Sequence, residues 1–169
     1  MDMIYKIENI LNEFELKFLK NLCENFKISN RPTNSNFYVR MKITESDFLK
    51  GIEEKFNSYI EPIKNQKYTL IQNGSCWINR VDIDTNTNDG FHHDITDISL
   101  VIYINDDFDG GRLEYIEGSE RKAIEVKQNL GIVLDDKIPH RVTPVTEGVR
   151  YSLVCFFVEG NSKTKKTLL

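Results

Sequence analysis

The start of the chain predicts a short strand followed by an amphipathic helix. Residues 4–7 are predicted to form a short extended segment. Asn12 and Glu15 then form a capping box in front of an apolar stripe over 14–26. The stripe contains Phe14, Phe18, Leu19, Leu22, Cys23 and Phe26. This spacing indicates a helix with one face to bury.

A second helix is predicted further along the helical front. The residues preceding it, 37–43, alternate well enough to form a strand. The helix is expected to begin near Thr44, with Asp47 as its third residue, and to end at Pro62. Its apolar stripe contains Phe48, Ile52, Phe56 and Ile60. This helix therefore also has one face to bury.

From residue 68 onward, the pattern changes to short strands separated by turn residues. The predicted strands are 68–72, 75–83, 98–105, 112–116, 121–126, 130–134, 140–145 and 149–158. About eight short strands at this spacing indicate a sandwich or a barrel. Residues 100–104 and 152–158 are apolar at both parities, so both faces of these strands should be covered. We predict a mainly β fold, a jelly-roll (double-stranded β-helix) core with N-terminal α-helices covering one face.

The chain is expected to form a single domain over residues 1–169. It divides into a helical front (1–67), a jelly-roll core (68–158) and a C-terminal tail (159–169). A hydrophobic fraction of 40%, with ten Phe and seven Tyr, supplies the core. Three cysteines without a CxxC pair disfavour a disulfide scaffold or a structural zinc site.

Charge and hydropathy limit the expected surroundings and partners. A formal net charge of −4 gives no basic footprint, so nucleic acid is not an expected partner. The first ten residues lack the basic and apolar regions of a signal peptide, and no apolar run reaches the length of a membrane span. A cytoplasmic protein with no membrane partner is the expectation.

The three histidines concentrate the candidate chemistry. In an extended chain, residues i and i+2 point to the same face, so His92 and Asp94 should converge while His93 points away. His140 follows Asp94 by 46 positions. Two imidazoles and one carboxylate form the facial triad of non-haem Fe(II) oxygenases. The alternative is that His92 and Asp94 are polar loop residues after the Asn-rich stretch 84–90.

Arg150 is the second notable residue. Ser152, Val154 and Phe156 follow it at every second position and share its strand face. An arginine pointing into an apolar barrel is costly unless an anion meets it, and its planar fork fits a carboxylate. The alternative is a solvent-facing arginine at a strand end beside the turn at Gly148.

These residues lie in motifs that resemble the catalytic core of the 2-oxoglutarate- and Fe(II)-dependent dioxygenases, in particular the prolyl 4-hydroxylase-like branch. The matching segments are FHHD at 91–94, VIYIND at 101–106, GGRLEY at 110–115 and PHRVTPVTEGVRYS at 139–152. The resemblance covers residues 75–158, about half of the chain, and is less specific in the helical front. Each motif is common alone, and the order and spacing make the match specific.

The resemblance implies a role for each matching residue. His92, Asp94 and His140 would bind Fe(II), and no other catalytic side chain is implied. Arg150 and Ser152 would bind the co-substrate 2-oxoglutarate. Tyr103, in a Tyr-x-Asn element, would reach the same carboxylate as Arg150, or would be a core aromatic. O₂ is the implied oxidant, with ascorbate as a further cofactor.

Three residues are expected on the substrate side. Asn79 lies on the strand that enters the site, and His93 lies between two ligands. Gly110 would let backbone approach the site, or would serve a hairpin turn. Loops 84–90 and 105–111 are the expected walls of the substrate groove.

The implied function is hydroxylation of an unactivated C–H bond, with a prolyl or other side chain of a peptide or protein as substrate. The branch usually has a tyrosine between the first core strand and the HxD motif, which residues 80–84 lack, so the substrate type is left open. One alternative is a hydroxylase of small molecules or free amino acids. Another is a non-catalytic, cupin-like module that binds a metal or another ligand, although the chain has no HxH motif.

Overall fold

The computed structural model describes residues 4–26, 39–71, 75–85 and 90–160. Two helices and twelve strands make up this part of the chain. The front contains β1 (Ile4–Glu8), α1 (Glu13–Glu24), β2 (Val39–Lys42) and α2 (Ser46–Lys64). The first half of the core contains β3 (Tyr68–Leu70), β4 (Cys76–Asp82), β5 (Ile98–Tyr103), β6 (Asp109–Gly110), β7 (Leu113–Glu117) and β8 (Glu120–Ala123). The second half contains β9 (Leu130–Asp135), β10 (His140–Val142), β11 (Val145–Glu147) and β12 (Val149–Glu159).

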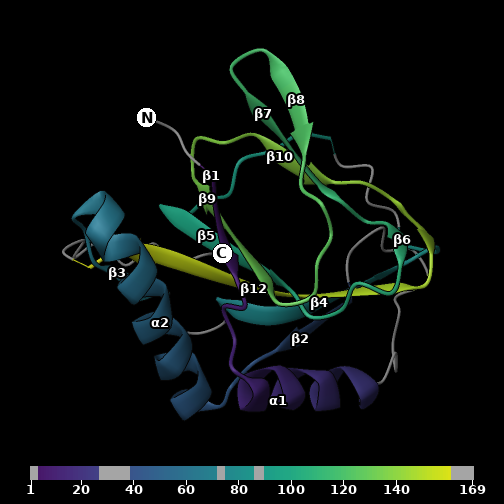
Figure 1. Ribbon diagram of the computed structural model, residues 1–169, viewed down its shortest axis with the longest axis horizontal. Helices are drawn as coiled ribbons and strands as arrows, with labels where there is room; N and C mark the ends of the chain where they lie inside the picture. The colour runs from purple at the N-terminus through teal and green to yellow at the C-terminus, as the bar shows by residue number, and fades with distance from the viewer. Residues whose placement is uncertain (1–3, 27–38, 72–74, 86–89, 161–169) are drawn as a thin grey trace.

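The strands form one large sheet and two small ones, with every ladder antiparallel (Figure 1). The large sheet has the order β1-β9-β5-β12-β4-β2, and β3 pairs with the end of β12. The small sheets have the orders β10-β7-β8 and β11-β6. The long strand β12 lies between β5 and β4, so it organises the centre of the large sheet. The predicted mainly β fold is confirmed.

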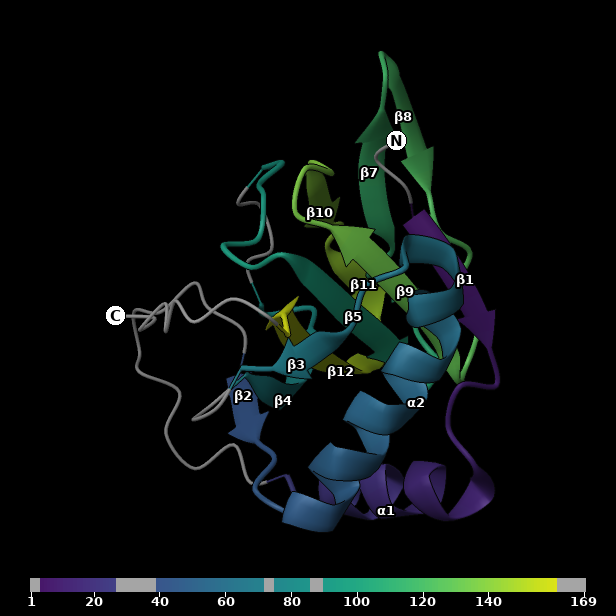
Figure 2. The same cartoon turned by 90° about the vertical axis from the view of Figure 1, so that its left-hand side faces the viewer.

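Two apolar cores lie on opposite faces of the large sheet. Both helices lie on one face, away from the β10-β7-β8 sheet (Figures 1 and 2). The core on that face joins Leu19 of α1 and Phe56 of α2 to Leu153 and Phe157 of β12. The other core contains Val101 and residues of the smaller sheets. The predicted helical cover on one face is confirmed, and β5 is buried along its whole length.

Helix α1 has the predicted capping box but buries a narrower face than its stripe indicated. The Asn12 side chain accepts from the Glu15 N–H at 2.9 Å, and the Glu15 carboxylate accepts from the Asn12 N–H at 2.7 Å. Leu19 and Cys23 are its buried residues. Phe14, expected on the apolar face, is 85% exposed. Phe14 precedes Leu19 by five residues, and at 3.6 residues per turn this places the two side chains about 140° apart around the helix axis.

Helix α2 begins one position later and ends two positions later than predicted. Glu45, not Thr44, is the N-cap, and it makes no side-chain capping bond. Pro62 lies inside the last turn, and the helix ends at Lys64. A proline lacks the N–H that would bond to the carbonyl four residues earlier, and its ring crowds that carbonyl, so the helix continues only two residues beyond Pro62. Asn65 ends the helix instead, with a left-handed φ of 51° and its N–H bonded to Glu61.

The remaining predicted strands match the structure with shifted ends. The short β6–β11 pair was not predicted, since neither strand is long enough to show a pattern. Residues 37 and 38 of the strand predicted over 37–43 and residues 86–89 of the loop predicted over 84–90 lie outside the described residues, as do 161–169 of the predicted tail. Neither described helix is long and apolar enough to cross a membrane.

Candidate metal and co-substrate site

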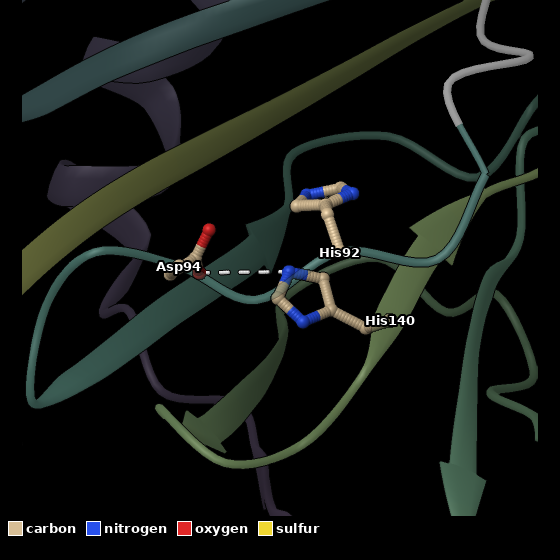
Figure 3. Close-up of side chains that lie close together, drawn as sticks. All are labelled: His92, Asp94 and His140. Atoms are coloured by element: carbon tan, nitrogen blue, oxygen red, sulfur yellow. Dashed lines mark ion pairs between the residues drawn. The ribbon is translucent and has the colours of Figure 1, made fainter.

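The backbone brings His92 and His140 together as a pair. Each donates its N–H to the carbonyl of the other, at 3.0 Å from His92 and 2.9 Å from His140. Asp94 follows two positions after His92, and its side chain turns toward His140 (Figure 3). One ligand atom from each of the three residues lies within 4.8 Å of the others. The predicted convergence of the three side chains is therefore present.

The carboxylate and one imidazole already interact. His140 Nε2 lies 3.5 Å from Asp94 Oδ2. Burial alone would raise the pKa of Asp94, but the hydrogen bond and charge of His140 lower it below the usual value, with smaller contributions from Ser99 and His92. Burial alone would lower the pKa of His140, and the Asp94 carboxylate raises it instead. The ionised carboxylate is thus favoured in the cluster, as a metal ligand requires.

His92 and His140 differ in burial and in the hydrogen bonds that orient their rings. His140 is buried, and its Nδ1 lies 2.9 Å from the Ile138 carbonyl, which fixes the ring and leaves Nε2 directed at the cluster. His92 is exposed, and its Nδ1 lies 3.4 Å from the Gly90 carbonyl, at the limit of a hydrogen bond. His93 is outside the cluster, with its Nδ1 3.0 Å from the Asp136 carbonyl.

Arg150 is a buried cation on the inner face of β12. It is 1% exposed, and its guanidinium lies over the Tyr103 ring at 5.1 Å from the centroid. Its Nε has no hydrogen-bond partner, and no carboxylate among the described residues pairs with it. The solvent-facing alternative is therefore wrong, because the side chain points into the barrel.

A row of polar side chains crosses the sheet beside Arg150. Ser152 lies opposite Asn79 on β4 and opposite Tyr103 on β5. The Ser152 hydroxyl and the side-chain amide oxygen (Oδ1) of Asn79 are buried without a hydrogen-bond partner. The Tyr103 hydroxyl accepts from the Leu113 N–H at 3.1 Å and keeps its own proton for another acceptor. These residues line one inner face with unused polar atoms.

Two neighbours of this face, Gly111 and Asn105, make contacts that the sequence did not predict. A Cβ on Gly111, whose φ is +57°, would lie 3.0 Å from Arg150 Cδ, so Gly111 is the glycine that packs against the arginine. Gly110, the residue named from sequence, packs against the Pro144 backbone in the β6–β11 pair instead. Asn105 accepts from the Tyr151 N–H at 2.8 Å and donates to the Val149 carbonyl at 2.7 Å. It therefore fastens the chain on both sides of Arg150.

A model of a known protein family matches part of the chain. The family described as "2OG-Fe(II) oxygenase superfamily" matches residues 77–158, which contain the triad, Arg150 and the polar row. This part of the chain belongs to the 2OG-Fe(II) oxygenase superfamily. The predicted resemblance is thereby confirmed.

Relatives of this oxygenase core include PKHD-type hydroxylases. A PKHD-type hydroxylase from Synechococcus sp. (strain JA-2-3B'a(2-13)) is 35% identical over 88 residues, covering 47% of this chain and 39% of the relative. The chain thus spans about two fifths of the curated relative's length.

Two solved structures share the fold at low sequence identity. One is a prolyl hydroxylase from Trichoplax adhaerens, in complex with a hypoxia inducible factor peptide fragment. It is 17% identical, with a TM-score of 0.65, over 94% of this chain and 84% of that one. The other is HygX from Streptomyces hygroscopicus with nickel, 2-oxoglutarate and hygromycin B bound. It is 12% identical, with a TM-score of 0.68, over 95% of this chain and 84% of the HygX chain.

The residues of the oxygenase core fit both groups that its superfamily name includes. Two imidazoles and one carboxylate within 4.8 Å of one another are the ligand set of a non-haem Fe(II) site. The buried Arg150 guanidinium, whose Nε has no hydrogen-bond partner, and the unpartnered Ser152 hydroxyl are groups that a dicarboxylate would satisfy. The chemistry of these side chains therefore fits Fe(II) and 2-oxoglutarate.

Proposed function

We propose that this protein is an Fe(II)- and 2-oxoglutarate-dependent dioxygenase that hydroxylates an unactivated C–H bond. The observation that carries the proposal is the buried Arg150, which pairs with no carboxylate of the described residues and lies on the inner face of the barrel that also holds the triad. A buried charge without a counter-ion costs several kcal/mol of stability. A ligand carboxylate that pairs with Arg150 would offset this cost, which makes an anionic co-substrate the natural occupant.

In this proposal His92, Asp94 and His140 hold Fe(II) as a facial triad. With 2-oxoglutarate and O₂, the bound iron supplies the oxidising power for hydroxylation, and the co-substrate leaves as succinate and CO₂. The role of the protein is to hold the ligands in place, with Asp94 kept ionised by its neighbours. Ascorbate is a further reductant that the reaction would accept.

Arg150, Ser152 and Tyr103 position the co-substrate. The Arg150 guanidinium would bind the far carboxylate of 2-oxoglutarate, and the Ser152 hydroxyl would donate a further hydrogen bond to it. The Tyr103 hydroxyl has a proton to donate to the same group. Val154 continues this face with a buried apolar side chain, which keeps water from the carboxylate and strengthens each bond.

The substrate is the finer part of the proposal. We favour a prolyl or other side chain of a peptide or protein, because the prolyl hydroxylase neighbour was solved with a peptide. A small molecule is the second candidate, because HygX has the same fold and was solved with hygromycin B. Asn79, His93 and Gly110 remain the substrate-side residues predicted from sequence.

The test is a succinate assay with Fe(II), 2-oxoglutarate and O₂ over a panel of proline peptides, other peptides and free amino acids. We expect succinate that rises with one member of the panel, and none from His92→Ala or Asp94→Ala. His93→Ala is the matched control for metal binding, because it removes an adjacent histidine outside the cluster and should bind metal like the wild type. Peptide-dependent turnover supports the first substrate class and amino acid turnover the second. Metal binding without any succinate would overturn the enzyme and leave a metal-binding module.

A further inference from the structure

Phe91, immediately before the ligand His92, lies under two arginines. The Arg141 guanidinium is 4.8 Å from the centre of the Phe91 ring, and the Arg121 guanidinium is 5.1 Å from it. Both distances are within the range of cation–π attraction. We call Phe91, Arg121 and Arg141 the aromatic clamp.

The clamp lies on the face of the small sheet opposite to the metal ligands. Arg141 pairs with Glu114, and Arg121 lies opposite Ile116, two residues further along β7, so both arginines share one face. His140 precedes Arg141 and points to the other face. His92 pairs with His140 in an antiparallel bridge, so Phe91 turns toward the arginines as His92 turns toward the metal cluster.

Within the clamp, Arg141 contacts the Phe91 ring and also forms an ion pair with Glu114. Its Nε and one terminal nitrogen each lie 2.7 Å from Glu114 Oε2 on the neighbouring strand. The Glu114 charge also reduces repulsion between the two arginines over one ring. Arg121 is exposed, and no carboxylate in the described part of the chain pairs with it.

His92 needs this support more than the other two ligands do. It is the exposed ligand, and its second ring nitrogen has only the 3.4 Å contact with the Gly90 carbonyl. Metal-bound histidines usually have a firm partner on that nitrogen, as His140 has with Ile138. The direction of the His92 ring must therefore be set largely by its backbone.

We propose that the aromatic clamp is a positioning device for the metal centre: Arg121 and Arg141 fix Phe91, and Phe91 fixes the orientation of His92. This inference rests on the proposed function, since it assumes that His92 is a metal ligand. Neither arginine touches the metal cluster. The effect on the metal is transmitted through the backbone between residues 91 and 92.

The test uses Co(II) titration of the metal-free protein, followed by the visible absorption of the bound ion. Phe91→Leu keeps an apolar side chain but removes the ring, and we expect Co(II) binding about tenfold weaker, the scale of lost outer-shell support, with a changed spectrum. Phe91→Tyr keeps the ring and should restore wild-type binding and spectrum. Arg121→Gln should weaken binding severalfold, and Arg112→Gln, an equal charge change away from the ring, should not.

The possible outcomes distinguish an effect of the aromatic clamp from a loss of folding and from a failure of the proposed metal site. Wild-type affinity and spectrum in Phe91→Leu would overturn the clamp, as would equal losses in Phe91→Leu and Phe91→Tyr. If Phe91→Leu also melts at a lower temperature, Arg121→Gln decides, because an exposed side chain changes the fold little, and unchanged Co(II) binding there would contradict the proposal. If the wild-type protein bound Co(II) no better than His140→Ala, the proposed function itself would fail.

Discussion

The two faces of β12 are equally buried and chemically different. Toward the helices, Leu153, Cys155 and Phe157 are fully covered, and the Phe157 ring stacks on Phe56 of α2 with centroids 4.0 Å apart. Toward the barrel, Arg150 and Ser152 are covered as completely. The first face is filled by side chains that satisfy one another by packing. The second keeps a charge and a hydroxyl without partners.

This difference indicates where the fold gives up stability for function. A buried polar atom without a hydrogen bond costs about 1–3 kcal/mol, so folded proteins retain few of them. Here Arg150, Ser152 and Asn79 place three such atoms on one side of two adjacent strands, β12 and β4. The helix-facing side should therefore determine stability, and the barrel-facing side should determine ligand binding. Substitutions on the two faces test this division.

The largest effect on stability is expected on the helix-facing side. Phe157→Ala removes a fully buried ring that stacks on Phe56, and should lower the free energy of unfolding by about 3–5 kcal/mol. Urea unfolding measures this loss. The affinity of the folded protein for 2-oxoglutarate, measured by calorimetry with Mn(II) in place of Fe(II), should stay the same. A large loss of affinity without a loss of stability would reverse the assigned roles.

Arg150→Met should weaken 2-oxoglutarate binding without lowering stability, the opposite of Phe157→Ala. Losing the buried partner of a carboxylate costs about 3 kcal/mol or more, so 2-oxoglutarate should bind about 100-fold more weakly. The ligand-free protein should be as stable as the wild type or more stable, because an unpaired buried charge is removed. Calorimetric titration and thermal unfolding measure the two quantities.

Arg80 offers a matched control for this substitution. It is buried on the same sheet but forms an ion pair with Asp82, on the parity that faces the helices. Arg80→Met should lower stability and leave 2-oxoglutarate affinity unchanged. If Arg80→Met and Arg150→Met gave the same pair of results, the contrast between the faces would be lost.

Ser152→Ala should give a smaller effect of the same kind as Arg150→Met. Removing one hydrogen bond to a charged group costs about 1.5 kcal/mol, which corresponds to roughly tenfold weaker 2-oxoglutarate binding. The stability of the ligand-free protein should change by less than about 0.5 kcal/mol, because the hydroxyl has no partner to lose. A clear loss of stability would mean that the hydroxyl serves the fold.

The smallest effect is expected where α2 contacts β9, through the ion pair of Lys64 with Asp135. Burial opposes ionisation of both groups, yet the pair lowers the pKa of Asp135 and raises the pKa of Lys64. A lowered carboxyl pKa contributes stability above its ordinary value near 3.8, and that contribution disappears as the pH falls further. Lys64→Met should cost less than about 1 kcal/mol at pH 7, and the difference in urea unfolding should shrink as the pH falls below 3.8 and Asp135 becomes protonated. A constant difference would exclude the ion pair as its cause.

The sequence predicted most of the fold and the central residues of the site because both depend on spacing. Period-two patterns gave the strands, and the i, i+2 positions of Arg150 and Ser152 placed both side chains in the barrel. The exposure of Phe14 and the helical Pro62 were missed because they depend on where α1 and α2 pack and end. The contact of Gly111 with Arg150 was missed for a similar reason.

The contacts that support the site residues also could not be predicted from the spacing of residues in the sequence. The clamp on Phe91 joins residue 91 to residues 121 and 141, which come together only through the β10-β7-β8 sheet. The Asn105 bonds to the chain around Arg150 cross from the end of β5 to β12. Long-range contacts of this kind have no local pattern, so only the folded structure reveals them.

A crystal structure with Mn(II) and 2-oxoglutarate, prepared without O₂, tests the central claim most directly. The account predicts one metal ion bound by His92, Asp94 and His140, and one 2-oxoglutarate whose far carboxylate pairs with Arg150 and Ser152. A metal held elsewhere, or a co-substrate that leaves Arg150 without an anion, would contradict it.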